Sequence, residues 1–386
     1  HNGGQNTERT KDLLNTAAQA AHDVMTGGAF ELFAPQELGT EAYKYLFILE
    51  NEKSNPANIN KTGNKEYIFT RRHDPVINSI GFNITQGRLG NALYVTRKMA
   101  NMYLQSNGLP INPQTWNYTK VDDEYKNRDN RMNNQLMVPG QTYWGTNGGR
   151  IDWSGNAAEI ANASHRNFMP QTGTGYFPHK WCSERDGVPT GMEAYDFPVI
   201  RYAEVLLNYA EAKAELGEMD AAVWDQTIAQ LRSRAGVTPV VPDKADPYME
   251  AYFLNTVTDK WILEVRRERG IELCLEMGLR WDDDMRWHMG DLLTSDNNPW
   301  TGIWIGNTGY TYDFTGQSTD DNGDPVPDFY IRPGEDTEHS IAISNTGANQ
   351  TFSLNAAGNI VWEYKRTWGE KKYLRPIPQT AIPRNP

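Results

Sequence analysis

Acidic side chains are the first candidates for chemistry, because a glycosidase needs two carboxyl groups facing each other across a cleft at about 5 to 10 Å. The chain has 49 Asp and Glu residues, three of them consecutive at Asp282, Asp283 and Asp284. We interpret these three as the solvated end of a helix. The sequence contains no G-x-S-x-G elbow, no H-E-x-x-H pair and no G-x-x-x-x-G-K-[ST] phosphate loop. It therefore predicts no catalytic residue and no enzymatic activity.

Metal-binding patterns are also missing from the sequence. Its seven histidines are scattered, and no two have the i, i+4 spacing that a helical metal site needs. Asp320, Asn322 and Asp324 imitate the first ligands of a calcium loop, but Pro325 stands where that loop needs Gly. We predict no metal site and no cofactor, and a calcium site built from separate loops is left open.

Composition narrows the classes of ligand. Thirty-seven basic residues against 49 acidic ones give a formal net charge of -12, which disfavours nonspecific binding to nucleic acid or anionic lipid. A neutral or cationic ligand fits better. No apolar run approaches the roughly 18 residues that span a bilayer. Cys182 and Cys274 match no zinc-ligand spacing, so we interpret both as packing residues and leave a bridge between them open.

Aromatic residues are numerous for so polar a chain, with 12 Trp, 19 Tyr and 12 Phe. A sugar ring has an apolar face of C–H groups and a rim of hydroxyls, so it binds to an aromatic surface edged by polar groups. One Gly-rich segment has this composition. It predicts a ligand site made of Tyr143, Trp144, Asn147, Arg150, Asp152 and Trp153.

Other interpretations of the aromatic residues are open. Trp144 and Trp153 fit equally well as anchors that hold a long loop against the scaffold. A second aromatic cluster, which ranks lower as a ligand site, consists of Trp300, Trp304, Tyr310 and Tyr312.

Helical periodicity predicts a mainly α fold: an α-helical scaffold of tetratricopeptide-like helix hairpins with long loops and small β-hairpins. The clearest hairpin joins helices at 198–216 and 220–235 through Gly217, which suits the left-handed position after a helix end. Apolar residues on two stripes make the first of these an inner helix. Further helices are predicted within 9–34, ending at Gly27–Gly28, and at 41–51, 90–105 and 258–277, short strands at 66–70, 341–344, 351–354 and 360–364, and long loops at 107–195.

Four parts of the chain resemble the SusD/RagB family, in the order in which the family has them. RYAEVLLNYAEAKAELG at 201–217 matches the signature helix of that family. ERGIELCLEMGLRWDDDMRW at 268–287 is similar to its E-R-x-x-E-L-x-x-E-G-x-R-W-x-D-L-x-R segment, but has one extra residue after Glu276 and Asp284 in place of Leu. The other similar segments are RDNRM at 128–132, VPG at 138–140, TGYFPHKW at 174–181 and YLRPIPQTAIPRNP at 373–386.

The resemblance implies one SusD-like domain over residues 1–386 that lacks its N-terminal portion, where the signal peptide and lipidated cysteine would lie. It implies a non-catalytic, outward-facing lipoprotein of a Gram-negative outer membrane, which binds oligosaccharides and delivers them to a TonB-dependent, SusC-like transporter. No nucleic-acid partner is expected. A peptide-binding protein of the same family and a glycoside hydrolase are the alternatives. Ion pairs between helices are expected for the charged motif residues Arg201, Glu204, Glu211, Glu272 and Arg280.

Overall fold

The computed structural model of the protein describes its helical scaffold and several short strands. The described residues are 7–81, 84, 95–113, 116, 121–137, 174–176, 178–183, 192–304, 310–312, 329–333, 340–343, 353–362 and 365–373. Their helices are α1 (Thr7–Thr26), α2 (Ala42–Leu46), α4 (Arg97–Ala100), α5 (Asn130–Gln135), α8 (Tyr202–Glu215), α9 (Ala221–Gln226), α10 (Ile228–Arg234), α11 (Pro247–Tyr252), α12 (Lys260–Glu272) and α13 (Leu279–Arg286). Their strands are β1 (Tyr67–Arg71), β2 (Phe197–Arg201), β3 (Trp300–Trp304), β4 (Tyr310–Tyr312), β5 (Phe329–Pro333), β6 (Ser340–Ile343), β7 (Ser353–Leu354) and β8 (Asn359–Trp362).

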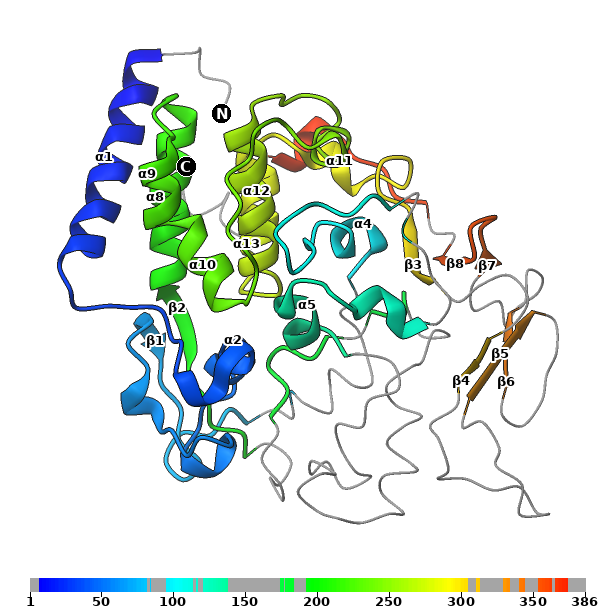
Figure 1. The fold of residues 1–386 in the computed structure, drawn as a ribbon, viewed down its shortest axis with the longest axis horizontal. Helices are drawn as coiled ribbons and strands as arrows, with labels where there is room; N and C mark the ends of the chain where they lie inside the picture. Colours follow the sequence, from blue (N-terminus) through cyan, green and yellow to red (C-terminus); the bar gives the residue numbers. More distant parts are fainter. Residues whose placement is uncertain are drawn as a thin grey trace, which may run out of the picture.

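The fold is mainly α, as predicted. Helices α1, α8 and α12 lie side by side, and α8 occupies the middle of this layer (Figure 1). Ala18 and Ala21 of α1 share an apolar cluster with Tyr209 of α8 and Val265 of α12. Helix α8 is therefore an inner helix, because it buries apolar residues against neighbours on two sides. Among the described helices, none is both long enough and apolar enough to span a bilayer.

The helix hairpin after residue 200 has the predicted turn but different helix bounds. Gly217 has a φ of +72°, and Glu218 N donates to Lys213 O at 2.8 Å, which closes the end of α8. The second helix is divided into α9 and α10 at Thr227, which has a φ of -130° and a ψ of -92°. Its Oγ1 donates to Val223 O at 2.6 Å, and such a side-chain bond competes with the helical backbone.

The strand β2 occupies residues that we predicted to begin the first helix of this hairpin. Pro198 disfavours a helix there because it lacks an N–H and its ring clashes with a preceding carbonyl. β2 pairs antiparallel with β1, where Phe69 lies opposite Ile200. The helices predicted at 41–51 and 90–105 are also shorter, since only α2 and α4 form among the described residues of these stretches.

Two further sheets lie on the side of the molecule away from α1 (Figure 1). β3, β8 and β7 form an antiparallel sheet, in which β7 and β8 are a small hairpin as predicted. β5 and β6 pair in parallel, so these two strands are not a hairpin. Cys182 and Cys274 are both buried and no disulfide joins them.

A network of charged side chains is buried between the helices. Glu272 of α12 accepts hydrogen bonds from Arg201 Nη1 at 2.7 Å, from Arg131 Nη1 at 3.0 Å and from Arg234. All four side chains are at most 1% exposed. The network therefore connects α5, α10 and β2 to α12.

The ion pairs expected from the sequence form in part. Arg201 pairs with Glu272 as expected, and Glu211 of α8 pairs with Arg286 of α13. Arg280 instead pairs with Asp284 within its own helix, at 3.0 Å. Glu204 forms no ion pair among the described residues. Its half-buried position therefore raises its pKa, since burial disfavours the charged carboxylate.

Candidate functional site

The described chain stops at Met137, before the predicted ligand segment, and resumes at Thr174 after it. The six residues of that segment, Tyr143, Trp144, Asn147, Arg150, Asp152 and Trp153, lie outside the described residues. The chain before it ends at Leu136 and Met137, which are fully buried, and Leu136 pairs with Pro178 after it. Thr174, also buried, is the first described residue on the return. The described residues on either side of 138–173 are thus buried in the core.

The returning chain crosses β3 at Gly302. Ile303 N donates to Thr174 O at 2.8 Å, and a Cβ at Gly302 would lie only 2.0 Å from the same oxygen. Only glycine permits this approach. Gly175 has a φ of +83° and packs against Ile303, which is fully buried. β3 is therefore held against Thr174 and Gly175 by close backbone contact.

A buried polar network supports β3 from the core side. Arg97 Nη1 donates to Gly302 O at 3.4 Å and to Tyr176 OH at 3.2 Å. Tyr176 OH in turn donates to Glu124 Oε1 at 2.5 Å, and the Glu124 side chain is fully buried. These hydrogen bonds hold the strand rigidly, so the side chains at its ends keep a fixed position.

Trp300, at the start of β3, presents an aromatic surface to solvent. It is 37% exposed, and the guanidinium of Arg366 lies 4.9 Å from the centre of its ring. Arg366 N donates to Ser295 Oγ at 2.5 Å, and its side chain donates to the carbonyl of Asn298. Burial lowers the pKa of Arg366. We call Trp300, Asn298 and Arg366 the Trp300 site.

The Trp300 site has polar atoms without partners. Asn298 Oδ1 and Arg366 Nε are buried and form no hydrogen bond among the described residues. An unsatisfied buried polar atom costs about 1 to 3 kcal/mol, so a ligand hydroxyl that reached these groups would remove that penalty. The site therefore combines a partly exposed indole with a guanidinium that lies over its ring and a neighbouring amide.

The second predicted aromatic cluster is divided between two sheets. Trp304 is half-buried at the far end of β3, opposite Asn359 of β8. Tyr310 and Tyr312 belong to β4, in the other three-stranded sheet, and their side chains lie outside the described part. The two tryptophans therefore lie on β3 and the two tyrosines on β4, in different sheets.

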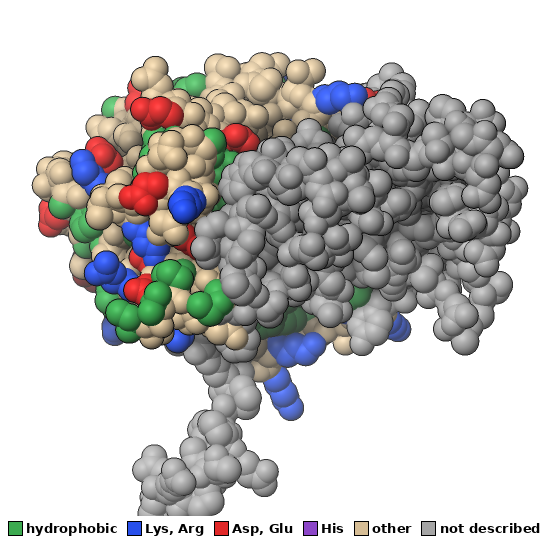
Figure 2. All heavy atoms as spheres, turned by 90° about the horizontal axis from the view of Figure 1, so that it is seen from below, with side chains coloured by type: hydrophobic (Ala, Val, Ile, Leu, Met, Phe, Trp, Pro, Cys, Tyr) green, Lys and Arg blue, Asp and Glu red, His purple; other side chains and the backbone are tan. Residues whose placement is uncertain are grey.

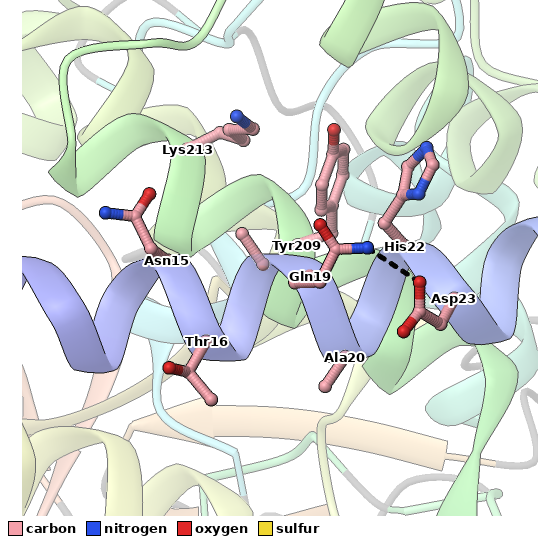
Figure 3. A pocket seen from close by; sticks show the side chains of 9 residues that line it. Asn15, Thr16, Gln19, Ala20, His22, Asp23, Tyr209 and Lys213 are labelled. Atoms are coloured by element: carbon pink, nitrogen blue, oxygen red, sulfur yellow. Dashed lines mark hydrogen bonds between the residues drawn. The ribbon is translucent and has the colours of Figure 1, made fainter.

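Two hollows beside α1 lack such an aromatic face. The first, about 750 Å³, lies between α1 and α8 and is lined by polar groups (Figure 3). Tyr209 there is only 8% exposed, and Gln19 Nε2 donates to Asp23 Oδ1 at 2.7 Å. The second, about 1010 Å³, is lined by charged residues of α8, α12 and α13 that bond to one another, such as Arg286 with Glu211. Trp287 also lines the second hollow, but the guanidinium groups of Arg266 and Arg286 lie 4.6 and 4.9 Å from the centre of its ring.

Comparison with known proteins then places the chain. The family model described as the SusD family matches residues 48–386. The chain belongs to the SusD family. A SusD-like carbohydrate binding protein from Bacteroides fragilis has a similar structure, with 21% identity and a TM-score of 0.57, covering 97% of this chain and 60% of that one. A second SusD-like protein from the same species has 17% identity, a TM-score of 0.55 and coverages of 97% and 61%.

This SusD-family chain therefore spans about 60% of the length of both solved relatives. Likeness at this level of identity shows the fold, and the ligand has to be argued from the site. Among the curated proteins searched, none matches the chain.

The acidic run of this SusD-family chain is not the solvated helix end that we predicted. Asp282 is exposed, but Asp283 and Asp284 are only 3% and 4% exposed. Asp283 accepts two hydrogen bonds from Arg269, both at 2.9 Å, and Asp284 pairs with Arg280. The prediction is wrong because arginines that are 4 to 14 residues away in the sequence fold over these carboxylates. In the same described residues, no three His, Cys, Asp or Glu side chains are placed to hold a metal ion.

Sequence reasoning missed Asn298 and Arg366 of the Trp300 site. Asn298 is two residues before Trp300, inside a polar loop that resembles many others in the chain. Arg366 is 66 residues after Trp300 and reaches it because β8 pairs with β3, with Trp362 opposite Trp300. A paired register of β3 and β8 is the only signal that could have found it.

Proposed function

We propose that this SusD-family chain belongs to a non-catalytic, cell-surface protein of a Gram-negative outer membrane that binds oligosaccharides. It delivers them to a TonB-dependent, SusC-like transporter and is held at the membrane by a lipid anchor. The observation that carries the proposal is the exposed ring of Trp300, fixed on a rigid strand beside Arg366 and Asn298. The fold-similar protein from Bacteroides fragilis, described as carbohydrate binding, supports it.

The chemistry of the Trp300 site suits a neutral sugar. The apolar C–H face of a pyranose stacks on an indole, while its hydroxyls accept from guanidinium and donate to amide oxygen. Because the chain that follows the predicted segment reaches β3 at Thr174, we propose that Trp144 and Trp153 extend the same aromatic surface. A longer oligosaccharide would then contact both.

Calorimetric titration with a cognate oligosaccharide, chosen from a glycan array, tests the proposal. Trp300→Ala should weaken binding about five- to 150-fold, because one stacked and partly buried ring contributes about 1 to 3 kcal/mol. The matched control is Phe69→Ala, which removes a ring 62% exposed on β1, on the other side of the molecule from β3 (Figure 1). Equal affinity of both variants and the unchanged protein would reject the Trp300 site.

The same titration on Trp144→Ala and Trp153→Ala separates the two roles left open for these residues. Ligand-stacking rings should lose affinity with an unchanged melting temperature. Loop anchors should instead lose about 3 to 5 kcal/mol of stability, the cost of truncating a buried Trp. A lowered melting temperature with full affinity would remove both residues from the site.

We also propose that the protein does not hydrolyse what it binds. The acidic pair Asp283 and Asp284 of α13 supports this proposal, because each carboxylate forms an ion pair with an arginine. Incubation with each bound glycan should give no new reducing ends. A peptide library assayed in parallel tests the remaining alternative: peptide binding that Trp300→Ala weakens, with no glycan binding, would replace sugars by peptides as the ligand.

We propose that residues 1–386 act as one domain. One apolar cluster supports this, because it includes Val95, Tyr252 and Ile360 and therefore draws on distant parts of the chain. Thermal unfolding should accordingly show a single transition. Two separated transitions would divide the chain into two domains.

A further inference from the structure

Exposed hydrophobic side chains are concentrated around the first two strands. Thirteen large hydrophobic side chains of the described residues are exposed, and five of them belong to β1, β2 or the turn after β1. Val76 and Ile77 are the most exposed of all, at 89% and 88%. Side chains so fully solvated form a convex tip, with almost no contact to the rest of the protein. The other three are Phe69, Val199 and Ile200.

The tip is held in this position by hydrogen bonds. Asp74 Oδ1 accepts from Val76 N and from Ile77 N, both at 2.7 Å. Asp74 N donates to Asn78 O at 3.0 Å, and Asn78 Nδ2 donates to Arg72 O at 2.7 Å. The bonds from Ile77 and Val76 lower the pKa of Asp74, so the carboxylate that closes the turn stays ionised. The turn thus keeps its two aliphatic side chains in water instead of folding them inward.

Positive charge lies next to the tip. Arg71 and Arg72 are exposed, and within the described residues neither forms an ion pair. The neighbouring cation Lys61 is already paired with Asp196, at 2.7 Å. Hydrophobic and basic side chains lie close together on the described part of the face that carries β1 and β2 (Figure 2). In a chain with a net charge of -12, two unpaired arginines beside an aliphatic tip stand out.

We propose that this turn is a lipid-contact site, in which Val76 and Ile77 enter the interface of an anionic membrane and Arg71 and Arg72 bind its headgroups. Interfacial membrane binding combines buried aliphatic groups with arginines that extend toward the lipid charges. A protein-binding surface would be expected to contain Tyr or Trp anchors, and the tip has none. The acidic remainder of the protein is repelled by such a membrane, so contact is confined to the turn and fixes the orientation of the molecule.

Vesicle co-sedimentation tests the site without any glycan. The protein should bind phosphatidylcholine vesicles that contain about 30 mol% phosphatidylglycerol, and bind pure phosphatidylcholine more weakly. Val76→Ser/Ile77→Ser should reduce the partition coefficient at least about tenfold. Arg71→Gln/Arg72→Gln should reduce it about fivefold per arginine on the anionic vesicles, and added salt should have the same effect.

The control is Val240→Ser/Val241→Ser, which changes an aliphatic pair 36% and 41% exposed elsewhere on the surface. It should bind vesicles as the unchanged protein does. Failure of the unchanged protein to bind either kind of vesicle would overturn the proposal and leave the tip as a contact for another protein. Equal binding by the Val76/Ile77 variant and the control would overturn it too. Glycan affinity should be the same in all these variants, so this result is independent of the Trp300 site.

Discussion

Glu272→Gln tests the buried charge network most directly. Glu272 is fully buried and its two oxygens accept hydrogen bonds from three arginines. Glutamine keeps the volume of the side chain but removes its charge and replaces one acceptor with an NH₂ donor. That donor would face the N–H groups of Arg201 and Arg234 on one side or of Arg131 on the other. At least one arginine therefore loses one of its buried hydrogen bonds, while Arg131, Arg201 and Arg234 each keep another carboxylate partner.

The expected loss of stability is large. Removing one partner of a buried ion pair costs about 3 to 5 kcal/mol, because the other charge stays buried without compensation. Because all three arginines keep another carboxylate partner, we expect a loss at the lower end of this range. An unfolding entropy of about 2.1 cal/mol/K per residue means that each kcal/mol lowers the melting temperature of a 386-residue chain by about 1.2 °C, so the melting temperature should fall by about 4 to 6 °C. Urea titration followed by tryptophan fluorescence measures the free energy directly.

The pH dependence of this loss follows from the pKa of Glu272. Burial alone would raise it, but Arg234, Arg201 and Arg131 lower it well below the usual value. A carboxylate with a lowered pKa stabilises the folded state above its unfolded pKa, and this contribution disappears as the pH falls below about 4. The difference in stability between Glu272→Gln and the unchanged protein should therefore be constant near neutral pH and shrink on acidification.

The matched control is Glu218→Gln. Glu218 pairs with Lys213 at 2.7 Å but is 51% exposed, so its neutralisation should cost less than about 1 kcal/mol. If Glu272→Gln cost no more than this control, the network would not hold the helices together, and the assignment of the motif residues to packing would be wrong.

Two further predictions concern the core and the support of β3. Burial raises the pKa of Asp284 to about 6, so the folded state binds this proton more tightly than the unfolded chain does. Between about pH 7 and pH 4 acidification should therefore stabilise the unchanged protein by about 2 kcal/mol more than Asp284→Asn, measured by urea titration at both pH values. Gly302→Ala would place a Cβ about 2 Å from Thr174 O, so it should lower both the melting temperature and the glycan affinity, whereas Gly369→Ala, with open space around it, should change neither.

The sequence predicted helices correctly where apolar periodicity decides the structure. The prediction failed where a single residue or a partner distant in sequence decides it. α1, α8 and α12 were found from their apolar spacing, since burial of one stripe is sufficient to make such a helix. β2 was missed because the apolar residues after Pro198 fit either element in a short window. The break at Thr227 depends on one hydroxyl that bonds a carbonyl four residues earlier. Apolar periodicity therefore predicts neither the strand β2 nor the helix break at Thr227.

The candidate site was predictable in composition but not in geometry. Trp300 was picked out as an aromatic residue in a polar stretch, and its exposure agrees with that role. Arg366 and Asn298 could not be predicted from the sequence. The pairing of β3 with β8 brings Arg366 to Trp300, and the conformation of a loop places Asn298 beside it. Asp284 shows the opposite error, since an acidic run looks solvated until arginines that cover it are placed in space.

The buried carboxylates and the exposed apolar side chains of this protein differ in what they leave available to a ligand. In the interior, the carboxylates of Glu272 and Asp283 use their oxygens to accept from arginine, so they have no free capacity to activate water or protonate a leaving group. The family motif that contains them therefore explains how the helices pack. At the surface, Trp300 and the turn at Val76 and Ile77 leave apolar area in contact with water, and such area is retained at a cost in stability. Recognition by this protein should accordingly be sought at these exposed surfaces, on strands that the buried network and the glycine crossing hold rigid.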